Sequence, residues 1–288
     1  MDWSHFGLAR RPFRPAVDTG SYFAAAGHDS ALAAVSAAYE RRDAGALIHG
    51  AAGLGKSLLA RLWLERLPEA APRVVLANHQ AARAADLLQA ILFDLNLPHL
   101  GQTEQELRLT VTEKLLDQAG QDTPLILFVD EAQNLGPSAI EELRLLGNIE
   151  SANGPALFTL LAAQPNLEPL LKFDVCAGFA QRLGAMCKLE PFTVDESAAY
   201  LSHQLKAAGG DLYEVFDGEA VTLLTGSCRG VPRLLNRAAT FAAELAVQGE
   251  AETIDVEAAM EAVTRLGLDE AEPETLVIKR AKKPRKVA

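Results

Sequence analysis

The first 190 residues alternate between short apolar runs and longer stretches of helical periodicity. Five runs are apolar enough to predict strands, and the run 125–129 suits a central parallel strand buried on both faces. They are 46–49, 73–77, 125–129, 157–162 and 185–189. Apolar residues recur at helical spacing in 28–42, 58–64, 86–95, 103–119 and 137–146. Strands that alternate with helices predict an α/β fold with a parallel sheet sandwiched by helices.

The pattern changes after Pro191. Segments 194–208, 218–226, 232–248 and 255–266 all show helical periodicity, with Gly or Pro between them. The chain therefore continues into a small all-α unit. Residues 1–26 hold aromatic residues at irregular spacing, which fits neither a helix nor a strand, and we expect an extended segment lying on the surface of the body.

A glycine-rich segment lies between the first predicted strand and a predicted helix. It reads Gly50-Ala51-Ala52-Gly53-Leu54-Gly55-Lys56-Ser57 and fits the phosphate-binding P-loop pattern G-x-x-x-x-G-K-[ST]. Glycines allow backbone N–H groups to approach phosphate oxygens, and the positive end of the following helix, at Leu58, adds to the attraction. Lys56 is expected to reach the β- and γ-phosphates, and Ser57 to hold Mg²⁺. The strand–loop–helix setting argues against an ordinary glycine-rich turn.

Two adjacent carboxylates follow the third predicted strand, at Asp130 and Glu131. Open α/β sheets bind ligands at the carboxyl ends of their strands, so we expect both side chains in the same crevice as the P-loop. Asp130 is expected to hold Mg²⁺ through its water shell, and Glu131 to polarise the attacking water. Taken alone the pair could be an acidic strand exit, but beside a P-loop it predicts a hydrolytic site.

The charge of the 288-residue chain is unevenly distributed. The net charge is −11, yet the ten residues from Lys279 to Ala288 include six basic residues and no acid. Without those six, 21 basic and 38 acidic residues remain, so residues 1–278 carry −17. An acidic body argues against a broad nucleic-acid-binding face. The basic tail Lys279–Lys286 is a candidate for binding DNA, RNA or anionic lipid, and a disordered solubilising end explains it at least as well.

The cysteine, histidine and hydropathy patterns argue against a disulfide-bonded, metal-ligating or membrane-spanning protein. Three cysteines without C-x-x-C spacing predict free thiols in a reducing compartment, and six histidines form no recognisable metal-ligand pair. No stretch approaches 18 apolar residues without a charge, and the N-terminus lacks a signal-peptide pattern. We therefore expect no transmembrane segment and a cytoplasmic location.

Four motifs along the chain resemble motifs of the AAA+ ATPases and, within that family, of the ExeA type, also called general secretion pathway protein A. Phe6-Gly7-Leu8 with Arg11-Pro12-Phe13 is similar to the opening F-G-L-x-x-x-P-F of that type, and Asp130-Glu131-Ala132-Gln133-Asn134-Leu135 matches its Walker B run. Ala163-Gln164-Pro165 with Leu167 resembles G-Q-P-x-L, although alanine stands in place of the usual glycine. Gly230-Val231-Pro232-Arg233 with Leu235-Asn236 resembles G-x-P-R-x-[IL]-N. The resemblance covers residues 3–266.

The resemblance implies roles for three more residues, which join Lys56 and Glu131 in the expected catalytic set. Gln164 corresponds to sensor 1, an amide that bonds the attacking water or the γ-phosphate; its alternative is a polar residue that closes a strand. Arg233 corresponds to sensor 2, which folds the lid onto the phosphates of its own subunit; its alternative is an arginine paired with surface acids. Arg182 corresponds to an arginine finger that completes a neighbour's site in trans.

The same resemblance implies the organisation of the chain. We expect an extended N-terminal segment near the nucleotide at 1–26, an AAA+ α/β core at 27–190, a helical lid at 191–268, and a disordered tail with a basic end at 269–288. ATP and Mg²⁺ are the expected ligands, and a homo-oligomeric ring or filament is the expected assembly.

The function implied is hydrolysis of ATP to drive conformational change or assembly, of the secretion-associated ExeA type. Two alternatives stay open. One is a DNA-associated regulator similar to the transposition-helper or initiator-like ATPases, for which the basic tail is the best support. The other is a slow nucleotide switch that mainly binds partners, against which the intact Asp130-Glu131 pair argues.

Overall fold

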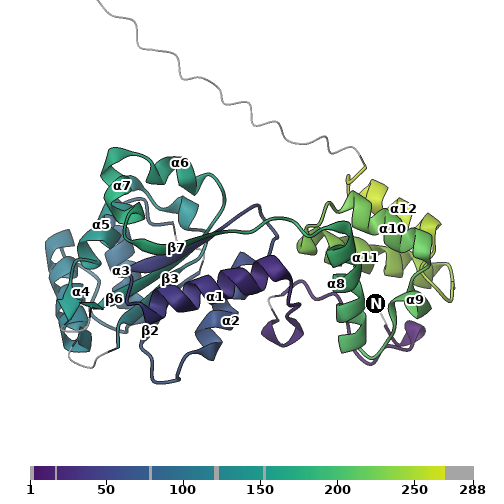
Figure 1. The fold of residues 1–288 in the computed structure, drawn as a ribbon, viewed down its shortest axis with the longest axis horizontal. Coiled ribbons are helices and arrows are strands. Elements are labelled where there is room, and N and C mark those ends of the chain that lie inside the picture. Colours follow the sequence, from purple (N-terminus) through teal and green to yellow (C-terminus); the bar gives the residue numbers. More distant parts are fainter. Residues whose placement is uncertain (1–2, 17, 78–79, 120–122, 152–153, 270–288) are drawn as a thin grey trace, which may run out of the picture.

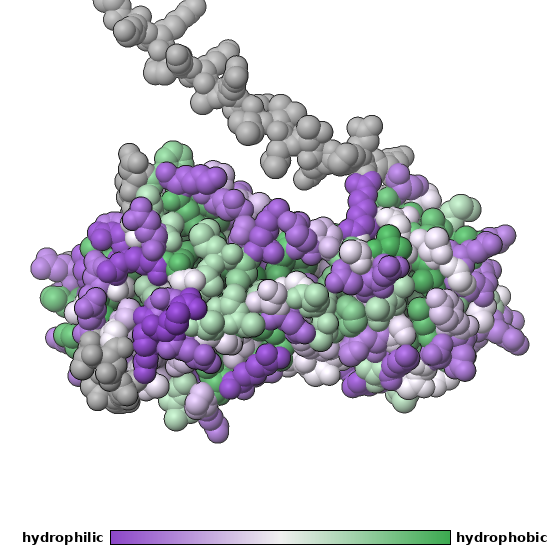
Figure 2. All heavy atoms as spheres, in the orientation of Figure 1, coloured by the Kyte–Doolittle hydropathy of each residue, from purple (hydrophilic) through white to green (hydrophobic). Residues whose placement is uncertain are grey.

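A computed structural model of the chain describes residues 3–16, 18–77, 80–119, 123–151 and 154–269. These residues form two lobes joined by a narrow waist (Figure 1). On the face shown in Figure 2, strongly hydrophilic residues cover the outer parts of both lobes, and hydrophobic residues lie along the middle. The basic tail lies outside the described residues. None of the described helices has both the length and the hydrophobicity that crossing a bilayer requires.

Five parallel strands form the centre of the first lobe, in the order β2-β3-β6-β1-β7. They are β1 (Gly45–His49), β2 (Arg73–Leu76), β3 (Leu125–Val129), β6 (Leu157–Ala163) and β7 (Leu183–Lys188). The three inner strands β1, β3 and β6 are buried along their whole length, as their continuous apolar runs predict. The parallel α/β prediction is confirmed.

The register of the sheet brings three predicted motifs to one edge. His49 pairs with Ala163, and Val129 pairs with Leu161. Gly50, Asp130 and Gln164 follow the ends of β1, β3 and β6. The P-loop, the acidic pair and the proposed sensor 1 therefore share the carboxyl edge of the sheet, where ligands of such folds bind.

Helices cover both faces of this sheet (Figure 1). Because successive residues of a strand face opposite sides, Ile48 and Phe128 pack with the helices α1 (Ala26–Glu40) and α2 (Lys56–Arg66). Leu47 and Leu127 pack on the other side, in a core shared with three helices. Those helices are α3 (Ala84–Asp94), α4 (Glu104–Ala119) and α5 (Pro137–Leu146).

The sequence patterns miss several short elements between α5 and β7. They are the hairpin β4 (Glu150–Ser151) and β5 (Gly154–Pro155), and the helices α6 (Leu167–Leu171) and α7 (Asp174–Ala180). Each is shorter than the window over which helical or alternating periodicity can be recognised.

Helices alone form the second lobe, the lid. They are α8 (Val194–Ala207), α9 (Leu212–Val215), α10 (Gly218–Ser227), α11 (Pro232–Gln248) and α12 (Val256–Arg265). All except the short α9 were predicted. Thr193 and Glu196 form a capping box at the start of α8, and Pro232 occupies the first turn of α11, so the sequence itself specifies where these helices begin.

The N-terminal segment differs from the expectation of an extended surface segment. Trp3–Phe6 form a 3₁₀ turn, and Trp3, Leu8 and Phe13 are buried in the hydrophobic core of the lid. The ring of Phe13 lies 5.8 Å from that of Trp3 and 6.3 Å from that of Phe216. Much of the buried face of α11 is alanine, so these aromatic rings supply volume that the lid helices lack. These three side chains are part of the lid interior, whereas Ser4, His5 and Arg10 of the same segment are exposed.

Phe13→Ala is expected to lower the midpoint of thermal unfolding, because the Phe13 side chain is only 1% exposed. Truncation of a buried aromatic ring costs about 3–5 kcal/mol. Phe93→Ala is the matched control, since Phe93 is 64% exposed and its truncation is expected to cost less than about 0.5 kcal/mol. Circular dichroism melts of the two variants measure the difference. Equal shifts would contradict the burial of the N-terminal segment in the lid.

Candidate functional site

The P-loop turns sharply between β1 and α2 and touches the lid. Gly53 and Gly55 have φ angles of +85° and +94°, which residues with side chains rarely adopt. A Cβ on Gly53 would lie 2.9 Å from Cβ of Arg233 and 3.0 Å from Cγ1 of Val231. The backbone N–H of Arg233 donates to the carbonyl of Gly53 at 3.3 Å. The glycine is thus required both by the loop conformation and by the close approach of the lid.

Lys56 is buried at the centre of this loop. Its Nζ donates to the carbonyl oxygens of Gly50 at 2.9 Å and Ala51 at 2.8 Å. Burial lowers the pKa of Lys56, while the carboxylates of Glu131 and Asp130 act in the opposite direction. The lysine and the acidic pair are therefore close enough to interact electrostatically, as the two sequence motifs together predict.

The acidic pair occupies the turn after β3. Asp130 is buried, and its Oδ1 accepts the backbone N–H of Glu131 at 3.0 Å. Glu131 has a φ of +51°, an unusual conformation for a residue other than glycine. Its Oε2 accepts a hydrogen bond from Nε2 of Gln164 at 3.1 Å and another from Nε2 of Gln133. Gln164 and Glu131 are thus brought together, and Gln133 joins them although no role was predicted for it.

The surroundings of Glu131 favour its charged form. Burial acts to raise its pKa, but the hydrogen bonds from Gln133 and Gln164 and the charges of Lys56 and Arg233 outweigh burial, so that the pKa is lowered. Glu131 is therefore a carboxylate at neutral pH, the form that can accept a proton from water.

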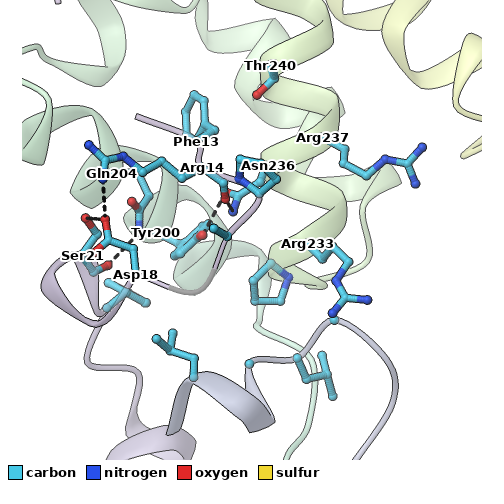
Figure 3. A pocket seen from close by; sticks show the side chains of 18 of the residues that line it. Phe13, Arg14, Asp18, Ser21, Tyr200, Gln204, Arg233, Asn236, Arg237 and Thr240 are labelled. Atoms are coloured by element: carbon cyan, nitrogen blue, oxygen red, sulfur yellow. Dashed lines mark hydrogen bonds and ion pairs between the residues drawn. The ribbon is translucent and has the colours of Figure 1, made fainter. Parts of the chain in front are cut away.

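A cavity of about 480 Å³ lies between the N-terminal segment, the P-loop and the lid, within the size range of small-molecule pockets. Figure 3 shows Asp18 and Ser21 of the N-terminal segment beside Gln204 of α8 on one side, with Arg233 and Arg237 of α11 on the other. Two hydrogen bonds tie these walls in place. Nε2 of Gln204 donates to the carbonyl of Ser21 at 3.0 Å, and the hydroxyl of Tyr200 donates to Oδ1 of Asn236 at 2.9 Å.

The predicted site residues divide by their relation to this cavity. Seven of the nine predicted nucleotide-binding residues, from Ala52 to Leu58, line it, whereas Gly50 and Ala51 direct carbonyls to Lys56. Glu131 and Arg233 line it as well. Gln164 reaches the site through its bond to Glu131.

Arg182 does not join the site of its own chain. It precedes β7, and Leu183 pairs with Gly45 at the start of β1, so Arg182 lies at the edge of the sheet opposite the P-loop. At about 3.3 Å per residue, the five residues of β1 separate the two edges by about 16 Å. The Nη1 atom of Arg182 donates to the carbonyl of Gly147 at 2.8 Å.

The sequence analysis missed an aromatic wall of the cavity that includes a histidine. The rings of Phe23, Phe192 and Tyr200 lie 5.6–5.8 Å apart, and the ring of His28 lies 5.2 Å from that of Phe192. Nε2 of the buried His28 is 2.8 Å from the carbonyl oxygen of Leu54 in the P-loop. A single histidine near a helix start gives no sequence signal for such a contact.

The donor set at the P-loop fits Mg²⁺. Ser57 supplies a hydroxyl and Asp130 a carboxylate, and Mg²⁺ prefers oxygen ligands. Among the described ranges, no group of three or more His, Cys, Asp or Glu side chains is arranged to hold a metal. A Mg²⁺ ion held by the Ser57 hydroxyl and the Asp130 carboxylate would take its other ligands from phosphate oxygens and water.

Comparison with known proteins decides the family. A family profile described as an AAA domain matches residues 40–171. General secretion pathway protein A of Aeromonas hydrophila is 30% identical over 234 residues, which cover 80% of this chain and 42% of that protein. These two matches support an AAA+ ATPase of the ExeA type. It spans about two fifths of the length of that relative.

Solved AAA+ structures confirm the fold class. Cdc6p from Pyrobaculum aerophilum has a TM-score of 0.67 at 18% identity, over 92% of this chain and 71% of that one. The Aeropyrum pernix ORC2 protein, in ADPNP–ADP complexes, has a TM-score of 0.64 at 17% identity, over 95% and 73%. The RuvB Holliday junction branch migration motor of Thermotoga maritima has a TM-score of 0.57 at 19% identity, over 89% and 74%.

The buried His28 leads to a pH-dependent prediction for this AAA+ protein. Burial lowers the pKa of His28 below 6.5, although its contact with Leu54 and nearby carboxylates oppose this. As the pH falls through about 6.5, the unfolded chain therefore takes up a proton that the folded chain resists, and the free energy of unfolding decreases. His28→Gln keeps a donor for Leu54 and should reduce that decrease. Thermal melts at about pH 7.5 and 5.5 measure it; an unchanged decrease in the variant would contradict the prediction.

Proposed function

We propose that this AAA+ protein binds ATP with Mg²⁺ between the core and the lid and hydrolyses it, with Glu131 as the general base. One observation carries the proposal. Lys56, the Asp130-Glu131 pair and Gln164 meet at one edge of the sheet, and the lid is hydrogen-bonded to the P-loop through Arg233 and Gly53. An ordinary glycine-rich turn or strand exit would not require these groups to converge.

The proposed orientation of the nucleotide follows from the walls of the cavity. The phosphates lie against Ala52–Leu58, where the loop glycines and the start of α2 offer backbone N–H groups. Arg233 then lies on the phosphate side. The base and ribose extend between the N-terminal segment and α11, toward the aromatic wall of Phe23, Phe192 and Tyr200. ORC2, which shares this fold, is described in complexes with ADPNP and ADP.

In the proposed reaction, Glu131 accepts the proton of the attacking water, and the amide of Gln164 orients that water or the γ-phosphate. Lys56 balances the negative charge of the phosphates. Mg²⁺, held by Ser57 and Asp130, would neutralise charge on the phosphate oxygens. The lowered pKa of Glu131 means that the carboxylate is ionised before the water arrives.

We further propose that hydrolysis drives movement of the lid in a homo-oligomer, and that the role is secretion-associated. The name of the Aeromonas hydrophila relative supports the secretion link, for the part of that protein that this chain spans. The DNA-associated alternative depends on the basic tail, which lies outside the described residues, and the likeness to RuvB, ORC2 and Cdc6p supports the fold alone.

Glu131→Gln is expected to reduce kcat for ATP hydrolysis by about 10²- to 10⁴-fold, because it removes the general base. The dissociation constant for ATP should change by less than about threefold, since the phosphates contact the P-loop. Phosphate release and calorimetric titration with ATP measure the two quantities. Lys56→Ala is the contrasting variant, in which binding itself should weaken. A Glu131→Gln protein that turns over ATP at the wild-type rate would refute the assignment of the base.

Arg182 generates a second prediction, because it lies too far from its own P-loop to contact the same nucleotide. The ATPase rate per subunit should rise with protein concentration, and Arg182→Ala should abolish that rise and lower the rate at least about tenfold. Mixing Arg182→Ala with Glu131→Gln subunits should restore activity, since the second variant supplies Arg182 to the intact Glu131 of the first. A rate per subunit that stays flat over a wide concentration range would contradict a finger in trans.

A further inference from the structure

We propose that Gln133 is the positioning residue of this site, which holds the carboxylate of Glu131 in the orientation that activates water. The inference rests on the proposed hydrolytic function and extends it to a residue for which no role was predicted. Gln133 lies in the 3₁₀ turn Ala132–Asn134, directly after Glu131. Its side chain lies between the ends of β3 and β6, where it bridges the acidic turn and Gln164.

The chemistry of its partners determines which way the Gln133 amide points. The backbone N–H of Gln164 donates to Oε1 of Gln133 at 2.9 Å. A backbone N–H can only donate, so the atom that faces it must be the amide oxygen. The NH₂ group of Gln133 is then directed to Oε2 of Glu131. The orientation of this amide, which is often ambiguous, is here fixed by the main chain.

Two amides act on the same oxygen of the proposed base. Oε2 of Glu131 accepts from Nε2 of Gln133 and from Nε2 of Gln164. These two bonds occupy the lone pairs of Oε2 and leave Oε1 as the oxygen that can accept from the attacking water. Correct alignment of a catalytic group contributes much of an enzyme's rate enhancement. Loss of one restraint on Glu131 should therefore slow turnover without weakening the binding of ATP.

The backbone around Glu131 makes such a restraint necessary. Glu131 has a left-handed φ of +51°, and its own N–H is bonded to Asp130. These features fix the main chain, but they leave the torsions of the glutamate side chain free. The side-chain amides of Gln133 and Gln164 supply the missing constraint from two different strand ends.

A comparison of Gln133→Glu, Gln133→Met and Asn134→Asp tests the proposal. Gln133→Glu keeps the acceptor for Gln164 and changes one atom, from a donor NH₂ to a carboxylate oxygen facing Glu131. Gln133→Met removes the hydrogen bonds without adding a charge. Asn134→Asp, at the exposed neighbouring residue, adds the same charge without facing Glu131 and serves as the matched control.

We expect kcat of Gln133→Glu to fall by about 10- to 100-fold, with a smaller fall for Gln133→Met and less than about twofold for Asn134→Asp. The dissociation constant for ATP should change by less than about twofold in all three. A fall in kcat with an unchanged dissociation constant for ATP separates misalignment of Glu131 from a general loss of structure, which would weaken both.

The outcomes separate this inference from the proposed function. In a Glu131→Gln background, Gln133→Glu should cause no further loss, because the two residues then act on the same step. If wild-type turnover does not depend on Glu131, the proposed function itself fails. If turnover depends on Glu131, but both Gln133 variants melt at the wild-type temperature and keep the wild-type kcat, the positioning role is overturned.

Discussion

The contact between Gly53 and the first turn of α11 is the constraint on which the arrangement of the site depends. The first N–H groups of a helix have no partner within the helix, and at α11 the proline at the first position has none to offer. The next N–H, from Arg233, finds its acceptor in the P-loop carbonyl of Gly53. Since no Cβ fits between Gly53 and the side chains of Arg233 and Val231, the lid meets the loop at backbone distance. A shift of the loop is transmitted directly to the lid helix.

The N-terminal segment, which forms one wall of the cavity, is packed into the lid. Trp3, Leu8 and Phe13 are embedded in the lid core, so the N-terminal segment would follow the lid in the proposed movement. The chain crosses between the lobes twice, just before α1 and just after β7, and the rings of Phe23 and Phe192 pack 5.7 Å apart where the two crossings meet. Two packed crossings restrict the directions in which the lobes can move relative to each other more than a single linker would.

The sequence predicted the parts of this structure that local patterns specify. Buried parallel strands produce continuous apolar runs, and the P-loop and acidic pair have fixed spacing to the strands that precede them, so the carboxyl edge of the sheet could be located in advance. The placement of Phe13, His28 and Gln133 could not. Their environments arise from contacts with residues 26 to more than 200 positions away, or from a turn geometry that periodicity does not encode. The N-terminal segment was misjudged for the same reason, because its aromatic rings fill space in another part of the chain.

Topology also constrains how many chains a complete site of the proposed kind needs. Residues at the carboxyl edge of a parallel sheet converge, as Gly50, Asp130 and Gln164 do, whereas a residue before a strand lies at the opposite edge. Arg182 is such a residue, and a strand of five residues separates it from the P-loop by more than an arginine side chain can span. If Arg182 acts on a nucleotide, that nucleotide must therefore belong to another subunit. In that case hydrolysis depends on assembly because β7 runs parallel to β1, which places Arg182 at the edge of the sheet opposite the P-loop. A change in the P-loop sequence would not alter that placement.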